Sequence, residues 1–560
     1  MSLNSNPLNV QRVLDPRLNI KEGQKLYTVV GGSMVNSWQQ FNATNVNNSN
    51  IQITANPPSQ NICISRLVYK RVVFSFSVQG TNTSGGPLLN SGFYGPRAMP
   101  LTAVTQAESV TLGNDTITQS PIQQYWRAML RYRNDLDNRN GIFSLSPSML
   151  DQHQKYEDAV GGVRNPLAGY DDNSAEQTRG SYVGFQLDPQ TPGNTIATGT
   201  LTTIEPIVMS PFSFGENGNN NTSFIGLQNM SYNCTLGNLQ RVLSLVQGQG
   251  ATPGDIVLQT PTVNVQSASL LMNYFTPDPT FSPIPSMSEY AFFNCVSYPT
   301  RSSQVVAPGA TVQLTMASVQ VSSIPKRIYV FAKRDDSAET CFTADSFMSL
   351  PKNTNPLSLT WNNNQFLATA SSEDLYNLSV KNGCSLSYTQ YSDKVGSVLA
   401  LDFGIDVGLQ PNQSAGSLGN YQLGLTCNFT NTSSDSYAPT LYVVVVSEGV
   451  FNINNGSANH MIGVLSPQDV LNAPMGDSDG FDTHRDVYGG SWKGFKNLMR
   501  KGMAFAKKHK LVSKGLKMMG GPYGTAASKA AESLGYGVSG GMLHGGSINF
   551  KGRNNLSDMC

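Results

Sequence analysis

The sequence predicts an all-β protein made of two β-sandwiches side by side, with a few short inserted helices and a basic, partly helical C-terminal tail. Two observations predict the sandwiches. Runs of β-branched and aromatic residues recur along the chain, and clusters of Gly, Pro, Asn and Ser separate them, as in all-β sandwiches. A third observation, the concentration of lysine after residue 490, sets the tail apart from the rest.

The strand prediction rests on six runs, several of which are apolar at both alternate positions. A strand of that kind has both faces covered, so these strands are expected in the interior. The six runs are 67–80, 311–321, 326–334, 397–409, 421–430 and 440–453.

Two short helices are predicted, one within each set of strands. In SPIQQYWRAMLRYRNDLD, Ser120 is the expected N-cap and Pro121 the first helical residue. In SSEDLYNLSVKNG, Ser371 or Ser372 caps the start, and the Asn-Gly pair at 382–383 closes the end. One helix in each half suggests a duplicated unit, an interpretation that rests on layout because no residue-level repeat is visible.

This layout predicts six segments, with the linker between the sandwiches inside GNLQRVLSLVQGQGATPGD. They are an N-terminal arm (1–24), the first sandwich (25–240), the linker (241–255), the second sandwich (256–470), a flexible acidic and Gly-rich hinge (471–490) and the basic amphipathic tail (491–560).

Charge divides the chain unevenly. The net charge is only +1, but residues 491–560 hold twelve lysines and arginines against two acidic residues, a net charge of +10. The first 490 residues keep 25 basic and 34 acidic residues, a net charge of −9. An acidic body with a basic tail is expected when the tail meets nucleic acid, a membrane or an acidic partner.

The cysteines and the N-terminus indicate the kind of cellular compartment in which the protein folds. The seven cysteines are scattered, odd in number and never spaced as CxxC, which argues against a disulfide framework or a zinc module. We expect free thiols in a reducing compartment. The N-terminus lacks an apolar signal core, and no run approaches the ~18 apolar residues of a membrane span.

Catalytic patterns are weak. None of the five histidines lies beside a nucleophile signature, and GQGATPG has the wrong spacing for a phosphate-binding loop. The group Asp477, Asp479, Asp482 and Asp486 lacks the Gly and Glu of an EF-hand loop. We therefore predict no catalytic residue, no metal and no cofactor.

The tail carries the one clear binding pattern. In SWKGFKNLMRKGMAFAKKHK, apolar residues recur at steps of three and four, as in an amphipathic helix with an aromatic-rich face. Such a helix suits an anionic lipid surface, the phosphates of nucleic acid or the protein's own acidic body, and the sequence does not decide among them. The predicted contact residues are Trp492, Lys493, Phe495, Lys496, Met499, Arg500, Lys501, Lys507, Lys508, Lys510, Lys514 and Lys517.

Several stretches resemble the major capsid proteins of the polinton and adintovirus group, which includes polinton-like viruses and is allied to virophages. They are IPKRIYVFAKR, PLSLTWNNNQFLATASSEDLYNLSVKNG, GSLGNYQLGLTCNFTNTSSDSYAPTLYVVVVSEGVF and GVLSPQDVL, with a looser match through VVGGSMVNSWQQF and RLVYKRVVFSFSV. The resemblance covers about 320–475 and, more loosely, 25–80.

The resemblance implies a double jelly roll, in which two eight-stranded sandwiches stand side by side. It implies homotrimers that form pseudo-hexagonal capsomers and tile an icosahedral shell, assembled inside the host cell. The implied partners are neighbouring capsomers, penton or minor capsid proteins, and the viral genome or a membrane through an inward-facing tail.

The resemblance also implies an adenovirus-like maturation protease that prefers Gly-Gly sites. LHGG-S and VYGG-S would place cleavage between Gly490 and Ser491 and between Gly546 and Ser547, and would release residues 491–546. MMGG-P is a third match with an unfavourable proline. Two other interpretations stay open: a jelly-roll vertex or minor capsid protein that forms pentamers, and a soluble glycan-binding β-sandwich protein.

Overall fold

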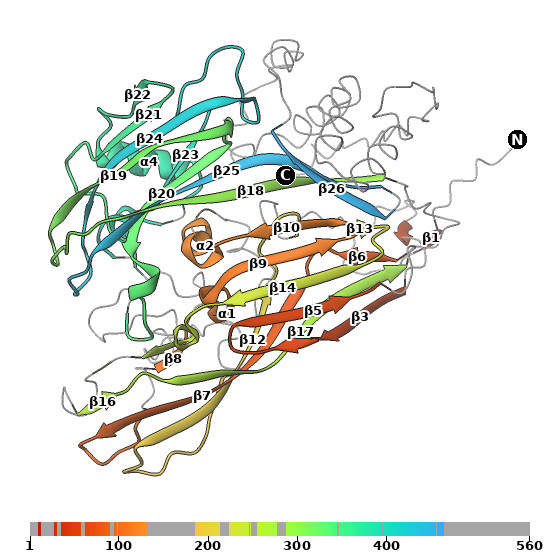
Figure 1. Ribbon diagram of the computed structural model, residues 1–560, viewed down its shortest axis with the longest axis vertical. Coiled ribbons are helices and arrows are strands. Elements are labelled where there is room, and N and C mark those ends of the chain that lie inside the picture. Colours follow the sequence, from red (N-terminus) through yellow and green to blue (C-terminus); the bar gives the residue numbers. More distant parts are fainter. Residues whose placement is uncertain are drawn as a thin grey trace, which may run out of the picture. The chain divides into compact units, whose positions relative to one another are not determined.

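Strands dominate the computed structural model, which we describe by the labels of Figure 1. The structure describes residues 9–12, 27–30, 35–57, 62–89, 94–97, 99–130, 132, 185–212, 223–245, 247, 255–276, 287–343, 346–384, 386–394, 396–454 and 456–463.

The first half of the chain forms two packed antiparallel sheets from eight principal strands. In chain order they are β3 (Val35–Asn42), β5 (Asn50–Ala55), β7 (Tyr69–Asn82), β9 (Thr105–Leu112), β10 (Asp115–Gln119), β12 (Ile196–Pro206), β14 (Met230–Leu236) and β17 (Thr262–Thr276). One sheet has the order β3-β17-β7-β12 and the other β5-β14-β9-β10. Counted along the chain, these are strands 1-8-3-6 and 2-7-4-5, the arrangement of a jelly roll.

The second half repeats this topology. Its strands are β18 (Met287–Arg301), β19 (Thr311–Ser323), β20 (Arg327–Arg334), β21 (Leu357–Trp361), β22 (Asn364–Phe366), β23 (Leu399–Asp402), β24 (Leu418–Thr430) and β25 (Pro439–Asn454). The sheets β18-β25-β20-β23 and β19-β24-β21-β22 are again strands 1-8-3-6 and 2-7-4-5. The predicted all-β class and double jelly roll are confirmed.

Shorter strands extend these sheets or pair beside them. They are β1 (Asn9–Arg12), β2 (Tyr27–Val30), β4 (Asn45–Val46), β6 (Cys63–Ser65), β8 (Tyr94–Pro96), β11 (Phe185–Leu187), β13 (Ser223–Ile225), β15 (Leu243–Leu245), β16 (Ile256–Leu258) and β26 (Ser457–Ile462). β1 and β2 form a separate two-stranded ribbon, and β26 pairs with the end of β25.

A helix lies at the same topological position in each roll, between the fifth and sixth strands. The helical segments are α1 (Pro100–Val104), α2 (Ile122–Leu130), α4 (Ser372–Lys381), the 3₁₀ turns η3 (Leu239–Val242) and η4 (Asp336–Ala338), and the π-helical turn η5 (Gln390–Lys394). α4 has the predicted ends: Ser371 and Asp374 form a reciprocal capping box, and Asn382 is the C-cap. α2 begins at Ile122 instead of the predicted Pro121.

The sheet order corrects the predicted division between the rolls. β17 pairs with β7 and β3, so a strand assigned to the second sandwich belongs to the first. The predicted linker also contains the end of η3 and all of β15, whose Val242, Leu243 and Leu245 are buried in the first core. The stretch was misassigned because its flanking glycines suggested a loop, whereas its apolar residues pack between the sheets. The second roll begins at β18.

The predicted strand over 397–409 is shorter than expected. β23 ends at Asp402, where the side chain of Asp406 accepts a hydrogen bond from the Asp402 amide at 2.9 Å. Gly404 follows with a φ of 88°, a conformation that glycine adopts readily. This side-chain-to-backbone bond closes a turn that competes with the extended strand.

The two rolls share part of one core. The long strands β18 and β25 run past their own roll, and with β26 they lie along β10 and β13 of the first roll in Figure 1. Tyr290, Phe292, Phe451 and Ile453 thereby join the buried apolar cluster of the first roll. The ring of Phe224 lies 5.4 Å from that of Tyr290, in an edge-on contact.

Candidate functional site: the charged interface between the jelly rolls

The largest group of buried charges lies where the two rolls meet. The first roll contributes α2, η3 and the segment after β8, and the second contributes β20 and η4. Across this interface the rings of Tyr132 and Tyr329 are 5.4 Å apart, and Ser297 Oγ lies 3.1 Å from Gln124 Oε1 on α2. The interface therefore joins helix α2 to the sheet that contains β20 and β18.

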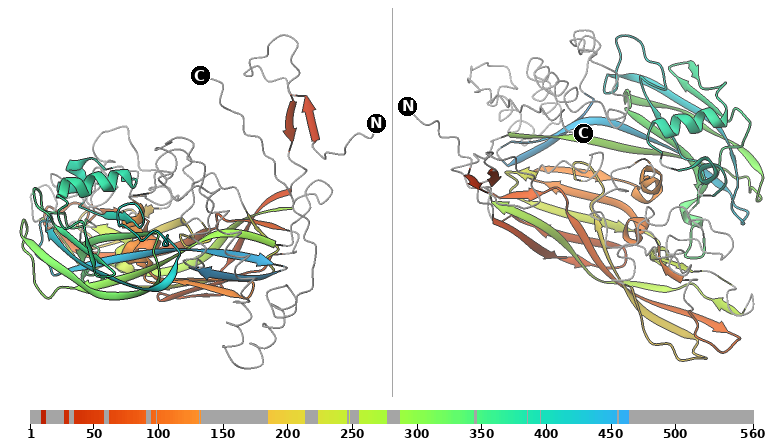
Figure 2. Two further views of the ribbon diagram at one scale, coloured as in Figure 1. Left: turned by 90° about the horizontal axis from the view of Figure 1, so that it is seen from above. Right: turned by 180° about the vertical axis from the view of Figure 1, so that it is seen from behind.

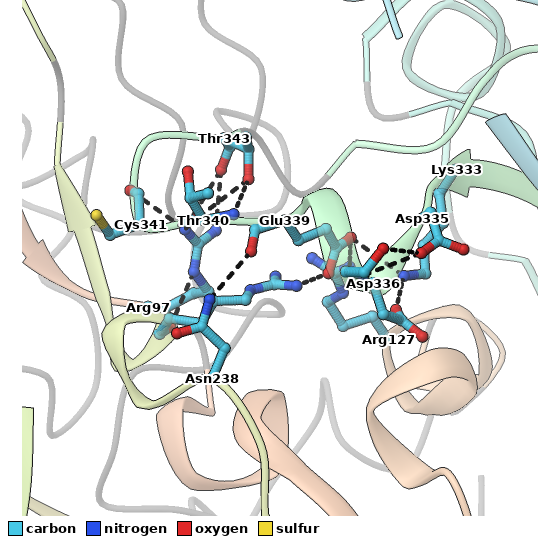
Figure 3. Close-up of polar contacts among 12 residues, drawn as sticks. Arg97, Arg127, Asn238, Lys333, Asp335, Asp336, Glu339, Thr340, Cys341 and Thr343 are labelled. Atoms are coloured by element: carbon cyan, nitrogen blue, oxygen red, sulfur yellow. Dashed lines mark hydrogen bonds and ion pairs between the residues drawn. The ribbon is translucent and has the colours of Figure 1, made fainter. Parts of the chain in front are cut away.

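Glu339 is the central carboxylate of this interface (Figure 3). Its Oε1 accepts hydrogen bonds from Arg127 Nη2 at 3.1 Å and from Lys333 Nζ at 3.1 Å, and its other oxygen pairs with Arg241. The carboxylate is 2% exposed. Two of its three cations come from the first roll, so one side chain of the second roll holds α2 and η3 in place.

Arg97 binds the same region through backbone carbonyls. Its guanidinium, fully buried after β8, donates to the carbonyl oxygen of Arg241 at 3.1 Å within its own roll. It also donates to the carbonyls of Thr340 at 3.1 Å and Thr343 at 3.3 Å in the second roll. Five donors in a rigid plane suit arginine to this task, because several carbonyls must be satisfied from one position.

Lys333 and Asp336 extend the cluster within the second roll. Burial lowers the pKa of Lys333 to about 8, although its ion pair with Asp336 works in the opposite direction. Burial alone would raise the pKa of Asp336, but the charge and hydrogen bond of Lys333 outweigh it and hold this pKa below its ordinary value. The attraction between Lys333 and Asp336 stabilises their charged forms, and the removal of both groups from water destabilises them.

Burial, followed by the nearby charges of Arg97 and Arg127, lowers the pKa of Arg241. Three arginines close together repel one another, which costs free energy. Glu339 offsets part of this cost because its carboxylate lies between Arg127 and Arg241. The charged interface orients the two rolls relative to each other and attracts them electrostatically. It does not supply a nucleophile, since burial raises the pKa of the neighbouring Cys341 thiol to about 12.

A second polar contact joins the rolls at β26. Asn114 Oδ1, in the turn between β9 and β10, accepts hydrogen bonds from Ala458 N at 2.7 Å and Ser457 Oγ at 3.0 Å. His460 Nδ1 lies 2.7 Å from Asp115 Oδ2. The last described strand is therefore fixed to the first roll.

Within the first roll, buried charges link the two sheets. Lys70 Nζ on β7 lies 2.8 Å from Glu108 Oε1 on β9, and Tyr232 donates to the same oxygen at 2.8 Å. Burial alone would lower the pKa of Lys70, but the nearby Glu108 raises it overall. Opposite Lys70, Glu205 accepts the amides of Leu101 and Thr102 at 2.8 Å and so satisfies the start of α1.

The structure describes none of the predicted site residues. The predicted tail contacts and the two Gly-Gly junctions, from Gly490 to Ser547, lie outside the described residues. The sequence reasoning missed Arg97, Arg127, Arg241 and Glu339. One available signal was the run KRDD at the end of an apolar strand, because charges at the end of a buried strand need partners.

Within the described ranges, no three His, Cys, Asp or Glu side chains are grouped as a metal site, and no helix has the length and apolar character to cross a membrane. The six cysteines that the structure describes are buried thiols that form no disulfide.

Comparisons with known proteins agree on one kind of protein. Residues 8–275 match the family described as the Sputnik virophage major capsid protein first domain, and residues 296–449 match the major capsid protein V20 C-terminal domain. The chain is 30% identical to capsid protein V20 of Sputnik virophage, over 98% of this chain and 97% of that protein.

Solved structures match in the same way. A chain in the cryo-EM structure of the Sputnik virophage is 27% identical in sequence to this chain. The match covers 87% of this chain and 100% of the matched chain, with a TM-score of 0.73. The crystal structure of the mavirus major capsid protein is 12% identical in sequence to this chain. The match covers 83% of this chain and 98% of the mavirus chain, with a TM-score of 0.64, and it shows that the two proteins share a fold.

Proposed function

Because the chain belongs to the Sputnik virophage family of major capsid proteins, and is thus a structural component of the virion, we propose that it assembles as a pseudo-hexagonal homotrimer that tiles an icosahedral shell. One observation carries this proposal. Two rolls of the same topology are joined through buried charges around Glu339, so each copy supplies two similar blocks in a fixed arrangement. Three such copies give six blocks around an axis.

The mass of the full chain in solution tests the trimer. Light scattering on a sizing column should give about three times the chain mass of 60.4 kDa. A pentamer would favour the vertex or minor capsid interpretation, and a stable monomer would favour a glycan-binding β-sandwich protein. Either result contradicts the trimer.

In this proposal the chain is not an enzyme, and its partners are neighbouring capsomers together with penton or minor capsid proteins. Within the wider group we place it near the polinton and adintovirus capsid proteins on the residues that carry the resemblance. The shared capsid fold makes assembly, instead of catalysis, the function that its loops and surfaces serve.

The basic tail is proposed to contact the genome or a membrane inside the shell. Its charge of +10 suits phosphate, and its aromatic-rich pattern suits a lipid surface. Binding of the full chain to duplex DNA and to vesicles of phosphatidylserine and phosphatidylcholine separates the two. DNA binding should weaken by roughly 10³-fold between about 50 and 200 mM salt if six or more phosphates are contacted.

Replacement of Lys507, Lys508 and Lys510 by glutamine should weaken either interaction more than replacement of Lys529 and Lys551, which lie outside the predicted helix. Equal effects of the two sets would contradict a specific contact by that helix.

Proteolytic release of the tail is proposed on the two flanking Gly-Gly junctions. Mass spectrometry of mature particles should find chains that end at Gly490 and a separate peptide covering residues 491–546. Particles that contain only the full chain, ending in Cys560, would exclude this maturation step.

A further inference from the structure

The described part of the chain ends against the second roll. Strand β26 runs antiparallel to the C-terminal end of β25, and its Ile462 lies opposite Gly449, near the point where β25 pairs with β20. Figure 2 shows these two strands, in blue, extending beyond the rest of the second roll. Gly463 then turns the chain with a φ of 61°, and its amide donates to the carbonyl of Glu448 at 3.2 Å. The surroundings of Gly463 therefore show where the next residues start.

Gly463 lies directly against the apolar side chain of Leu418. A Cβ atom on Gly463 would lie 3.2 Å from Leu418 Cδ2 and 2.8 Å from Ser323 Cβ. Leu418 is the first residue of β24, pairs with Ser323 of β19, and is 43% exposed. Because consecutive Cα atoms are about 3.8 Å apart, residue 464 starts within reach of this leucine.

A second exposed apolar side chain lies at the same end of the roll. Ile405, in the turn after β23, is 65% exposed. Both turns bond to the connection between β19 and β20: the Phe403 amide donates to the carbonyl of Lys326 at 3.0 Å, and the residue before Leu418 accepts the amide of Ile324 at 2.9 Å. Ile405 and Leu418 therefore flank one connection, and we call them the end patch.

The residues after Gly463 suit this patch. Residues 464–470 read VLSPQDV, with apolar side chains at Val464, Leu465 and Val470, whereas the predicted hinge that follows is acidic and rich in glycine. An extended chain of seven residues spans about 23 Å, so the segment can reach across this end of the roll. Its covalent link to β26 keeps it at a high effective concentration beside the patch, and burial of apolar area on both partners favours their contact.

We propose that residues 464–470 dock on the end patch of the second roll in the same chain, with Val464 and Leu465 against Leu418. The docked segment fixes the point from which the hinge and the basic tail leave the body. If the tail is released after Gly490, the docked segment stays with the body. The inference concerns a single chain and does not rest on the proposed trimer.

Photo-crosslinking in the full chain identifies what lies on the patch. With Leu418 replaced by the photoreactive residue benzoylphenylalanine, mass spectrometry should find crosslinks to residues 464–470. A mixture of isotope-labelled and unlabelled chains should show that these links form within one chain. Val305 is the matched control position, because it is 63% exposed in the loop at the opposite end of β19. Crosslinks between chains, or the absence of crosslinks to 464–470, would overturn the proposal.

Hydrogen exchange measures the docking without a crosslinker. Leu418→Asp should speed amide exchange in residues 464–470 by about tenfold or more, as expected when the burial of one leucine side chain is lost. Leu418→Met and Val305→Asp should leave this exchange unchanged, and near-ultraviolet circular dichroism checks that each variant is folded. Exchange in the wild-type segment as fast as in the hinge would overturn the docking. The proposed trimer is tested separately, by the mass in solution.

Discussion

At the scale of single residues, the interface between the rolls depends on one carboxylate, Glu339, that pairs with several cations. Glu339 binds Arg127, Lys333 and Arg241 while almost fully buried. Removing one partner from such a group leaves the others without compensation in a medium that cannot solvate them. The stability of the interface should therefore be most sensitive at the shared carboxylate.

Glu339→Gln is expected to lower the free energy of unfolding by about 3–5 kcal/mol, because the buried cations lose their common counter-charge. Asp393→Asn is the control: this carboxylate pairs with Lys352 at the surface, where a pair contributes about 0–1 kcal/mol. Chemical denaturation of both variants measures the difference. Equal losses would contradict the central role of Glu339.

Lys333 predicts a pH dependence of stability. Its pKa is about 8 in the folded chain and 10.5 ordinarily, so between these values the unfolded chain binds more protons. The contribution of Lys333 to stability should therefore rise with pH from about 8 to 10.5. In Lys333→Met this rise should be absent, while Arg127 and Arg241 still pair with Glu339. Identical pH profiles of wild type and variant, recorded by thermal unfolding, would contradict the assignment.

At the scale of elements, helix ends determine how the long connections are held on the rolls. α4 begins at a reciprocal capping box, in which Ser371 Oγ accepts the Asp374 amide at 3.1 Å and the Asp374 carboxylate accepts the Ser371 amide at 3.0 Å. The start of α1 is satisfied from a distance by Glu205 on β12. The first device is local in sequence and was predictable, whereas the second is not.

Ser371→Ala should reduce stability by about 1 kcal/mol, because one amide at the start of α4 loses its acceptor. Ser371→Asn is expected to retain most of the stability, since asparagine also caps helices and its uncharged amide can still donate to the Asp374 carboxylate, as the serine hydroxyl does at 2.8 Å. Thermal unfolding of the two variants provides the comparison. A loss of equal size in both would show that the hydroxyl serves another purpose.

At the scale of the whole molecule, the core of the first roll extends into the second roll. Tyr290, Phe451 and Ile453 of the second roll are buried with residues of the first, and Glu339 adds a charged contact. We expect calorimetry of the full chain to show one transition for both rolls. Two well-separated transitions would contradict a shared core.

Phe451→Ala should test this coupling directly. The ring is fully buried beside Phe224, so its removal should lower stability by about 3–5 kcal/mol and destabilise both rolls together. Val296→Ala is a milder control on the partner strand β18, because Val296 is 38% exposed. Protection of backbone amides from hydrogen exchange would show whether the loss extends to β5 and β14.

The sequence by itself determined the all-β class, the positions of most long strands and both ends of α4. These features depend on neighbouring residues: apolar runs bounded by turn residues, or a serine three positions before an aspartate. The predicted contacts of the basic tail remain predictions that its composition supports.

Only the tertiary structure decided the boundary between the rolls and the identity of the charged interface. β17 lies in the range that the sequence assigned to the second sandwich, and its membership in the first roll follows from pairing with β7, far away in sequence. Arg97, Arg241 and Glu339 each read as ordinary polar residues. Their burial together results from the packing of segments more than 90 residues apart, which no local pattern encodes.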